Sequence, residues 1–195
     1  MSDTISYYDS NAERFFRDTV NVDMEPLYKP FLALISPGGS ILDAGCGSGR
    51  DSLHFLQSGF HVEAFDASAE MCALASKLTG LNVAHQRFDE IQYASQFDGI
   101  WACASVLHVA RNETLPVIER LATALRPGKV IFLSFKNRDE TWSAGGREFT
   151  GYTPDSLRRL LQGQESLSEI QMWTTEDRRP DCKETWLNAL LRRER

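Results

Sequence analysis

Residues 41–51 combine an apolar run, a carboxylate and three alternating glycines, and they restrict the fold more than any other segment. The apolar run predicts a β-strand that reaches Asp43, and Gly45, Gly47 and Gly49 follow closely behind it. Because glycine has no Cβ, such a loop can turn tightly and bring its backbone close to a ligand. A helix that begins behind the loop would add unpaired N–H groups and a partial positive charge. The segment therefore predicts a nucleotide-type ligand at the end of a strand.

The glycine spacing distinguishes between kinds of nucleotide. The dinucleotide fingerprint G-x-G-x-x-G serves a pyrophosphate, whereas this chain has G-x-G-x-G, and Arg50 stands where the third glycine of the fingerprint would be. The chain also contains no G-K-[ST] triplet of the kind that ends a phosphate-binding loop. Asp43 would repel a phosphate but would suit a ligand with a cationic group. S-adenosylmethionine, which has a sulfonium and no phosphate, fits these requirements better than a nicotinamide dinucleotide.

Five blocks of the chain resemble, in order, the motifs of the class I S-adenosylmethionine-dependent methyltransferases. They are residues 42–49, 62–66, 97–102, 106–109 and 125–131, and the resemblance extends over roughly residues 38–136. Within that family, the chain resembles the bacterial type that acts on small molecules. Residues 7–9 and 185–191 are similar to a subgroup often labelled tellurite-resistance-related.

The resemblance implies a three-layer, Rossmann-like α/β sandwich. Its seven-stranded sheet would be mostly parallel, with an antiparallel last strand inserted between its neighbours. Strand and helix patterns that alternate along the chain independently predict a parallel sheet covered by helices on both faces. We expect strands at about 40–44, 60–65, 82–85, 98–103, 130–135, 166–174 and 183–192. We expect helices in two pieces within 7–35, at about 49–58 and 69–78, from an N-cap at Asn112 to about 126, and at 154–162.

The length of 195 residues predicts a single domain. We divide it into an N-terminal helical lid segment (1–37), a cofactor-binding core (38–136), and a substrate-side insertion with the closing strands (137–195). The net charge of −6 argues against a general nucleic-acid or anionic-membrane surface. We therefore expect a small molecule as partner and no membrane, with the protein a monomer or a homodimer.

The cysteines and histidines are scattered along the chain, four of each, and no C-x-x-C pair occurs. A metal site is therefore not expected. The sequence shows no signal peptide and no apolar run of membrane length, so a cytoplasmic, reducing location is the expectation.

Asp66 ends the second predicted strand, and a carboxylate there can accept hydrogen bonds from both ribose hydroxyls. The resemblance implies that Met71 packs on the adenine. It also places Arg87 where many relatives have an acid that binds the adenine amino group, so that Phe88 would contribute through its backbone and ring. The full predicted set for S-adenosylmethionine, with S-adenosylhomocysteine as product, is Tyr8, Asn11, Asp43, Ala44, Gly45, Cys46, Gly47, Gly49, Asp66, Ala67, Met71, Arg87, Phe88 and Cys103.

Methyl transfer needs alignment of the reacting atoms and exclusion of water more than it needs covalent help from the protein. His108, the histidine on the predicted active edge, is a candidate general base or substrate-orienting group, and Tyr8 is a second catalytic candidate. We expect the acceptor to contact Phe16, Lys136 and Arg147, because these residues lie outside the common sheet and offer an aromatic ring and two cations.

These observations favour a methyltransferase that acts on a small molecule by in-line displacement. A protein or a tRNA as acceptor is one alternative, and a non-catalytic protein that only binds S-adenosylmethionine is another. A [DN]-P-P-[YF] signature, typical of amino methylation, is absent after the fourth strand, where residues 102–105 stand instead.

Overall fold

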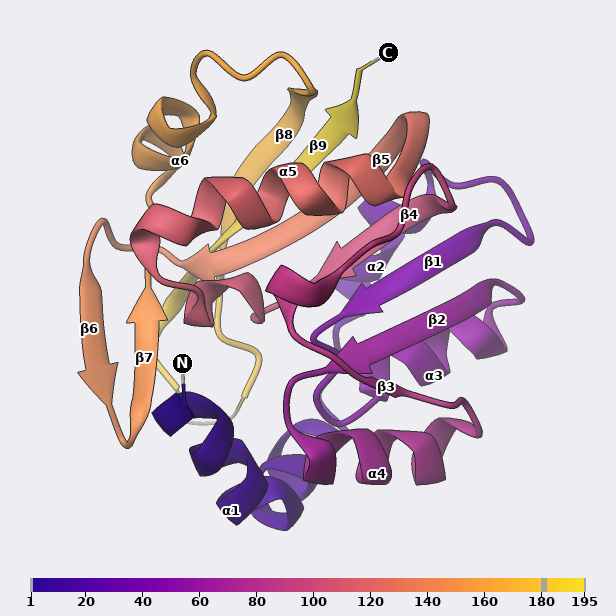
Figure 1. The fold of residues 1–195 in the computed structure, drawn as a ribbon, viewed down its shortest axis with the longest axis vertical. Coiled ribbons are helices and arrows are strands. Elements are labelled where there is room, and N and C mark those ends of the chain that lie inside the picture. The colour runs from indigo at the N-terminus through magenta and orange to yellow at the C-terminus, as the bar shows by residue number, and fades with distance from the viewer. Residues whose placement is uncertain (1, 180–181, 195) are drawn as a thin grey trace.

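A seven-stranded mixed sheet in the order β3-β2-β1-β4-β5-β9-β8 forms the centre of the computed structural model, which describes residues 2–179 and 182–194 (Figure 1). Its strands are β1 (Ser40–Ala44), β2 (His61–Asp66), β3 (Ala84–His85), β4 (Phe97–Ala102), β5 (Leu125–Lys136), β8 (Leu167–Glu176) and β9 (Thr185–Arg193). β1 to β5 are parallel, and β9 lies antiparallel between β5 and β8. The predicted fold, including the inserted antiparallel last strand, is confirmed.

Helices cover both faces of this sheet. α5 (Thr114–Ala124) crosses the front in Figure 1, whereas α2 (Glu25–Leu32) and α3 (Arg50–Gln57) lie behind the sheet. The remaining helices are α1 (Ser2–Thr19), α4 (Ala69–Thr79), α6 (Pro154–Leu161) and the short 3₁₀ turns η1 (Phe88–Glu90), η2 (Val106–His108) and η3 (Arg111–Glu113). No helix among the described residues combines the length and the hydrophobicity that crossing a membrane requires.

Each face of the sheet has its own apolar core, because successive side chains on a strand point to opposite faces. The front core joins Leu42, Ile100 and Ile131 to α5, while the rear core joins Trp101 and Phe132 to α2 and α3. The two rings of Trp101 and Phe132 stack with their centroids 4.0 Å apart.

Local signals in the sequence account for several element boundaries. The Ser68 side chain accepts a hydrogen bond from the N–H of Met71 and so caps α4, and Thr153 caps α6 in the same way. The prediction for Asn112 was wrong: that residue lies in η3, and α5 begins at Thr114 without a side-chain cap.

A two-stranded hairpin stands apart from the main sheet and was not predicted. It consists of β6 (Thr141–Ala144) and β7 (Arg147–Thr150), joined by a Gly145-Gly146 turn. Both glycines have positive φ, 58° and 78°, as a tight hairpin turn requires. The hairpin lies beside the start of α1, beyond the carboxyl ends of the parallel strands (Figure 1).

The carboxyl ends of β1 to β5 meet at one edge of the sheet. β8 runs in the same direction as these strands, because it is antiparallel to β9, so the β8–β9 connection reaches the same edge. Ligands of open α/β sheets bind at this edge. The fold therefore brings the glycine loop, α1, the hairpin and the β8–β9 connection together.

Candidate functional site

The loop between β1 and α3 adopts a conformation that only glycine tolerates easily. Gly45 has φ of 79°, and a Cβ added there would lie 2.5 Å from the Cβ of Ser105. The N–H groups of Gly45 and Cys46 both donate to the carbonyl oxygen of Phe65, at 2.9 and 3.0 Å. These bonds fix the loop against the end of β2, where the predicted ribose-binding carboxylate lies.

Asp66 is that carboxylate, and backbone groups hold both of its oxygens. The N–H of Gly47 donates to one oxygen at 2.8 Å, and the N–H of Ser68 donates to the other at 2.9 Å. Burial raises the pKa of Asp66, and the hydrogen bonds from Ser68 and Gly47 offset part of that rise. Each carboxylate oxygen has a second lone pair, so Asp66 can accept two further hydrogen bonds from a ligand.

A cavity of about 440 Å³ opens at this edge of the sheet. Its volume falls within the range of small-molecule and cofactor sites, which is roughly 300–1,000 Å³. Of the residues predicted from the sequence, those that line it are Tyr8, Gly45, Cys46, Gly47, Asp66, Ala67, Met71, Arg87, Phe88, Cys103, His108, Lys136 and Arg147. Most of the predicted residues are thus gathered around one space.

Five other predicted residues are not part of this lining. Asp43 and Ala44 are buried in β1, and Gly49 forms the left-handed N-cap of α3, where a Cβ would come within 3.0 Å of Ala75 in α4. Asn11 on α1 donates to the carbonyl of Tyr7 at 2.8 Å. Phe16 does not line the cavity, but its neighbour Phe15 does, because adjacent helical residues face different directions. Direct contact between these five residues and a ligand stays a prediction.

Tyr8 and His108 form a hydrogen-bonded link between α1 and the hairpin. The Nδ1 of His108 lies 2.7 Å from the carbonyl oxygen of Glu148, and its Nε2 lies 2.8 Å from the Tyr8 hydroxyl. A carbonyl oxygen only accepts, so Nδ1 carries the proton and Nε2 accepts from Tyr8. Burial lowers the pKa of His108 to about 4, which keeps the imidazole neutral at physiological pH. The N–H of Glu148 in turn donates to Thr4 on α1 at 2.9 Å.

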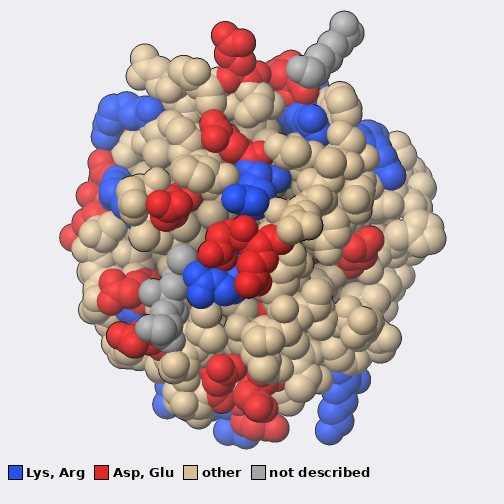
Figure 2. Space-filling model, viewed as in Figure 1, with Lys and Arg blue, Asp and Glu red and all other residues tan. Residues whose placement is uncertain are grey.

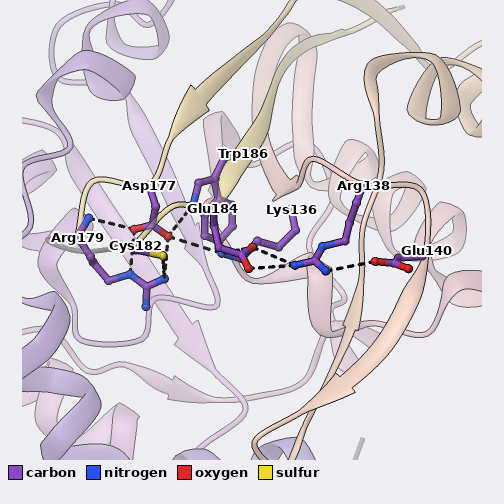
Figure 3. Close-up of polar contacts among 8 residues, drawn as sticks. All are labelled: Lys136, Arg138, Glu140, Asp177, Arg179, Cys182, Glu184 and Trp186. Carbon is purple, nitrogen blue, oxygen red and sulfur yellow. Dashed lines mark hydrogen bonds and ion pairs between the residues drawn. The ribbon is translucent and has the colours of Figure 1, made fainter.

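Lys136, predicted to bind an acceptor, is already neutralised by carboxylates. Its ammonium lies 3.1 Å from Glu184 and 3.6 Å from Asp177, over the ring of Trp186 (Figure 3). Figure 3 shows the network continuing on both sides: Arg179 and Trp186 donate to Asp177, and Arg138 joins Glu184 to Glu140. Although burial alone would raise it, these donors hold the pKa of Asp177 well below its usual range. The three cations of this network therefore face three carboxylates.

Arg147 is differently placed. Its guanidinium lies over the rings of Tyr7 and Phe149, at 4.5 and 5.2 Å from their centroids. Its Nε is buried and finds no hydrogen-bond partner in the described part of the chain. Phe149 stacks on Trp142, and both rings line the cavity, so the hairpin supplies an aromatic wall with a cation beside it.

A buried carboxylate that the sequence analysis missed lies between β1 and the rear core. Asp51, the second residue of α3, accepts hydrogen bonds from the Tyr28 hydroxyl at 2.5 Å, from Trp101 Nε1 at 2.8 Å and from Arg50 Nε at 2.6 Å. Burial would raise the pKa of Asp51, but Arg50 and the other donors hold it below its usual value. Tyr28 on α2 and Trp101 on β4 lie far from Asp51 in the chain, so spacing in the sequence carries no signal for these two contacts.

Asp43 has the opposite electrostatic environment. Burial and the nearby Asp51 carboxylate raise the pKa of Asp43 to about 8, and the Ser52 hydroxyl, which donates at 2.6 Å, offsets only part of that rise. A carboxyl group whose pKa is higher in the folded than in the unfolded protein stabilises the fold at low pH and loses this effect as the pH rises through the folded value.

We expect Asp43→Asn to remove this loss. The melting temperature of the wild type should fall relative to that of the variant between pH 5 and pH 8, because the unfolded chain has already released the Asp43 proton over that range, whereas the buried carboxyl keeps it until about pH 8. Calorimetric melts of both proteins at several pH values measure the difference. If the melting temperatures of the two proteins changed in parallel with pH across this range, the raised pKa of Asp43 would be contradicted.

Among the described residues, no cluster of three or more His, Cys, Asp or Glu side chains is arranged to bind a metal. On the face drawn in Figure 2, acidic and basic side chains are interspersed among neutral ones.

Comparison with known proteins gives matches to methyltransferases. Residues 41–128 match the family model described as "Methyltransferase domain". The chain is 27% identical over 139 residues to an uncharacterized methyltransferase of Staphylococcus carnosus, covering 68% of this chain and 67% of that protein. It is 30% identical over 138 residues to the ubiquinone biosynthesis O-methyltransferase of Aeromonas salmonicida, covering 60% and 57%. The chain thus spans about two thirds or less of the length of these curated relatives.

Solved structures match over nearly the whole chain. The 1,6-didemethyltoxoflavin-N1-methyltransferase of Burkholderia thailandensis, solved with 1,6-didemethyltoxoflavin and S-adenosylhomocysteine, has a TM-score of 0.80 and 22% identity, covering all of this chain and 87% of its own. The N-methyltransferase NodS of Bradyrhizobium japonicum, solved with S-adenosylhomocysteine, has a TM-score of 0.72 and 17% identity, covering 97% and 100%. At these identities the likeness establishes the fold alone.

Proposed function

We infer that this chain is a class I S-adenosylmethionine-dependent methyltransferase and that it transfers a methyl group to a small-molecule acceptor. The observation that carries the proposal is Asp66, held by two backbone N–H groups at the end of β2 and facing a cavity of about 440 Å³. A relative named for ubiquinone biosynthesis, and a methyltransferase of the same fold solved with 1,6-didemethyltoxoflavin, support a small-molecule acceptor.

The residues present fit S-adenosylmethionine. Asp66 would accept from the ribose hydroxyls, Met71 and Phe88 would enclose the adenine, and the glycine loop has no side chain where the ligand must approach. When bound, S-adenosylmethionine supplies a methyl group on a positively charged sulfur. The backbone just after β4, beside the same cavity, is strained. Ala104 adopts a φ of 54°, and its N–H donates to the Ser134 hydroxyl at 2.8 Å. Such strained backbone is found preferentially at functional sites.

The protein would accelerate the reaction mainly by placing its two ligands and excluding water. Correct orientation of the two ligands can by itself lower the activation barrier by about 7–11 kcal/mol. α1 closes over the cavity through Tyr8 and Phe15, and the hairpin adds Trp142 and Phe149. Arg147, whose Nε has no partner, would donate to the acceptor. Under this proposal, residues 1–37 would act as a lid, residues 38–136 would bind the cofactor, and residues 137–195 would form the acceptor side of the cavity.

Labelling with a radioactive methyl donor tests this proposal. The protein is incubated with tritiated S-adenosylmethionine and a bacterial cell extract, which is then separated into small-molecule, protein and RNA fractions. We expect label in the small-molecule fraction, and none there with an Asp66→Ala variant. Label confined to protein or tRNA would overturn the choice of acceptor, and donor binding without any labelled product would point to a non-catalytic protein.

His108 would act as a positioning residue rather than a general base. Its Nε2 is occupied by the Tyr8 hydroxyl, and burial lowers its pKa to about 4. We expect His108→Ala to slow methyl transfer roughly tenfold, because losing one hydrogen bond that orders Tyr8 removes about 1.4 kcal/mol. Initial rates between pH 5.5 and 8.5 make the measurement. A rate that rises through pH 6.5 in the wild type, and not in the variant, would instead identify a base.

A further inference from the structure

The rear face of the sheet changes from apolar to polar one step before its carboxyl edge. Trp101, Phe132 and Leu190 occupy neighbouring strands and belong to the rear core. Two residues farther toward the edge, the same face carries Ser134 on β5 and Asn188 on β9, which are direct cross-strand partners. The Ser134 hydroxyl is already used within the protein, because it accepts a hydrogen bond from the N–H of Ala104 at 2.8 Å.

Asn188 has an unmet hydrogen-bonding group. Its side chain is completely buried, and its amide nitrogen donates to the Thr175 hydroxyl on β8 at 3.0 Å. Its side-chain oxygen has no hydrogen-bond partner among the residues that the structure describes. Leaving such an oxygen buried and unpaired costs free energy, so native proteins pair nearly all of them. Ser134, Thr175 and Asn188 all line the cavity described above, so a ligand in that cavity could supply the missing donor.

The sheet order places Ser134, Thr175 and Asn188 on the side of the cavity where the methyl acceptor would bind. Asp66 ends β2, the glycine loop follows β1, and Cys103 follows β4. A donor bound along these three strands leaves the next three, β5, β9 and β8, for its reaction partner. Strands lie about 4.8 Å apart, so Asn188 on β9 is roughly 10 Å beyond the end of β4. This argument rests on the proposed function, since the donor site orients it.

The surrounding charges define the class of ligand. Lys136 and Arg179 line this part of the cavity, but Glu184 and Asp177 neutralise them. No unbalanced charge in this network calls for an ionised ligand. The Trp186 ring stands beside Lys136 on the same wall and offers a flat apolar surface (Figure 3).

We propose that Asn188 is a specificity-determining residue, whose side-chain oxygen accepts a hydrogen bond from an N–H or O–H group of an uncharged, flat methyl acceptor. Thr175 is the positioning residue that holds the amide in this orientation. The hydrogen bond selects acceptors that carry a donor at that point and rejects analogues in which the donor is capped, because those would leave the oxygen unpaired.

Matched probes test the proposal without knowledge of the natural acceptor. 2-Quinolone and 2-naphthol each present one N–H or O–H, and N-methyl-2-quinolone and 2-methoxynaphthalene are the same rings with that donor capped. Dissociation constants are measured by NMR titration of the protein saturated with S-adenosylhomocysteine. We expect the wild type to bind the uncapped member of at least one pair roughly tenfold more tightly, and Asn188→Leu to reduce that ratio to about one.

Two variants of Thr175 test the proposal even if the Asn188 variant does not fold. Thr175→Val removes the hydroxyl that anchors the amide and should reduce the preference, whereas Thr175→Ser keeps the hydroxyl and should retain it. Equal binding of capped and uncapped probes to the wild type, a preference that survives in Asn188→Leu, or failure of all four probes to bind would each overturn the proposal. If S-adenosylhomocysteine itself does not bind the wild type, the proposed function fails instead.

Discussion

Asp66→Ala should weaken the binding of S-adenosylmethionine by roughly 100-fold to 1,000-fold. The variant loses a carboxylate that would accept two ribose hydroxyls, and a hydrogen bond to a charged group contributes about 1.5–3 kcal/mol. It also frees the N–H groups of Gly47 and Ser68, which the carboxylate now holds, so the glycine loop loses its anchor. Isothermal titration calorimetry with S-adenosylmethionine and S-adenosylhomocysteine measures the change.

Two controls separate the carboxylate from general damage to β2. Asp66→Asn keeps one acceptor oxygen and should show an intermediate loss, and Glu63→Ala, at an exposed position of the same strand, should bind normally. Burial raises the pKa of Asp66, so affinity in the wild type should also decline as the pH falls toward that pKa. Unchanged affinity in Asp66→Ala, at an unchanged melting temperature, would remove Asp66 from the binding site.

Asp51→Ala should destabilise the folded protein by about 3–5 kcal/mol, the cost of leaving one member of a buried ion pair without its partner. Arg50 would keep its charge, and the donors of Tyr28 and Trp101 would lose their acceptor. For a chain of this size we expect a fall in melting temperature of roughly 10 °C. Urea unfolding followed by tryptophan fluorescence gives the free energy directly.

Partial variants show which contacts contribute. Tyr28→Phe removes one donor and should cost about 1 kcal/mol, while Asp155→Ala, at an exposed position of α6, should leave stability unchanged. In a double variant, Arg50→Met should recover part of the loss caused by Asp51→Ala, because the buried charge is then absent. Additive losses in the double variant would mean that Arg50 and Asp51 act independently.

The parts of the molecule that the sequence predicts well are those where chemistry is local. The glycine loop and Asp66 could be placed because strand ends, turn residues and carboxylates follow one another within a few positions. The parallel direction of the first strands follows from strand and helix patterns that alternate along the chain. The place of β9 between β5 and β8 came from the resemblance, since periodicity identifies a strand but not its neighbours.

The rest depends on contacts between residues far apart in the chain. Asp51 meets Trp101 across 50 positions, and Asn188 looks like one polar residue in an apolar strand until Thr175 and the cavity are seen beside it. The β6–β7 hairpin did carry a readable signal, a Gly145-Gly146 pair between short alternating segments, which is typical of a two-residue turn.

That hairpin forms its own small sheet and pairs with no strand of the central one. Its backbone can therefore lengthen, shorten or be exchanged without disturbing the register of β5 and β9. Through Trp142, Arg147 and Phe149 it nevertheless supplies one wall of the cavity. Under the proposed function, residues 141–150 would form a module that evolution, or an engineer grafting the segment from a relative, could exchange to change the acceptor without rebuilding the central sheet.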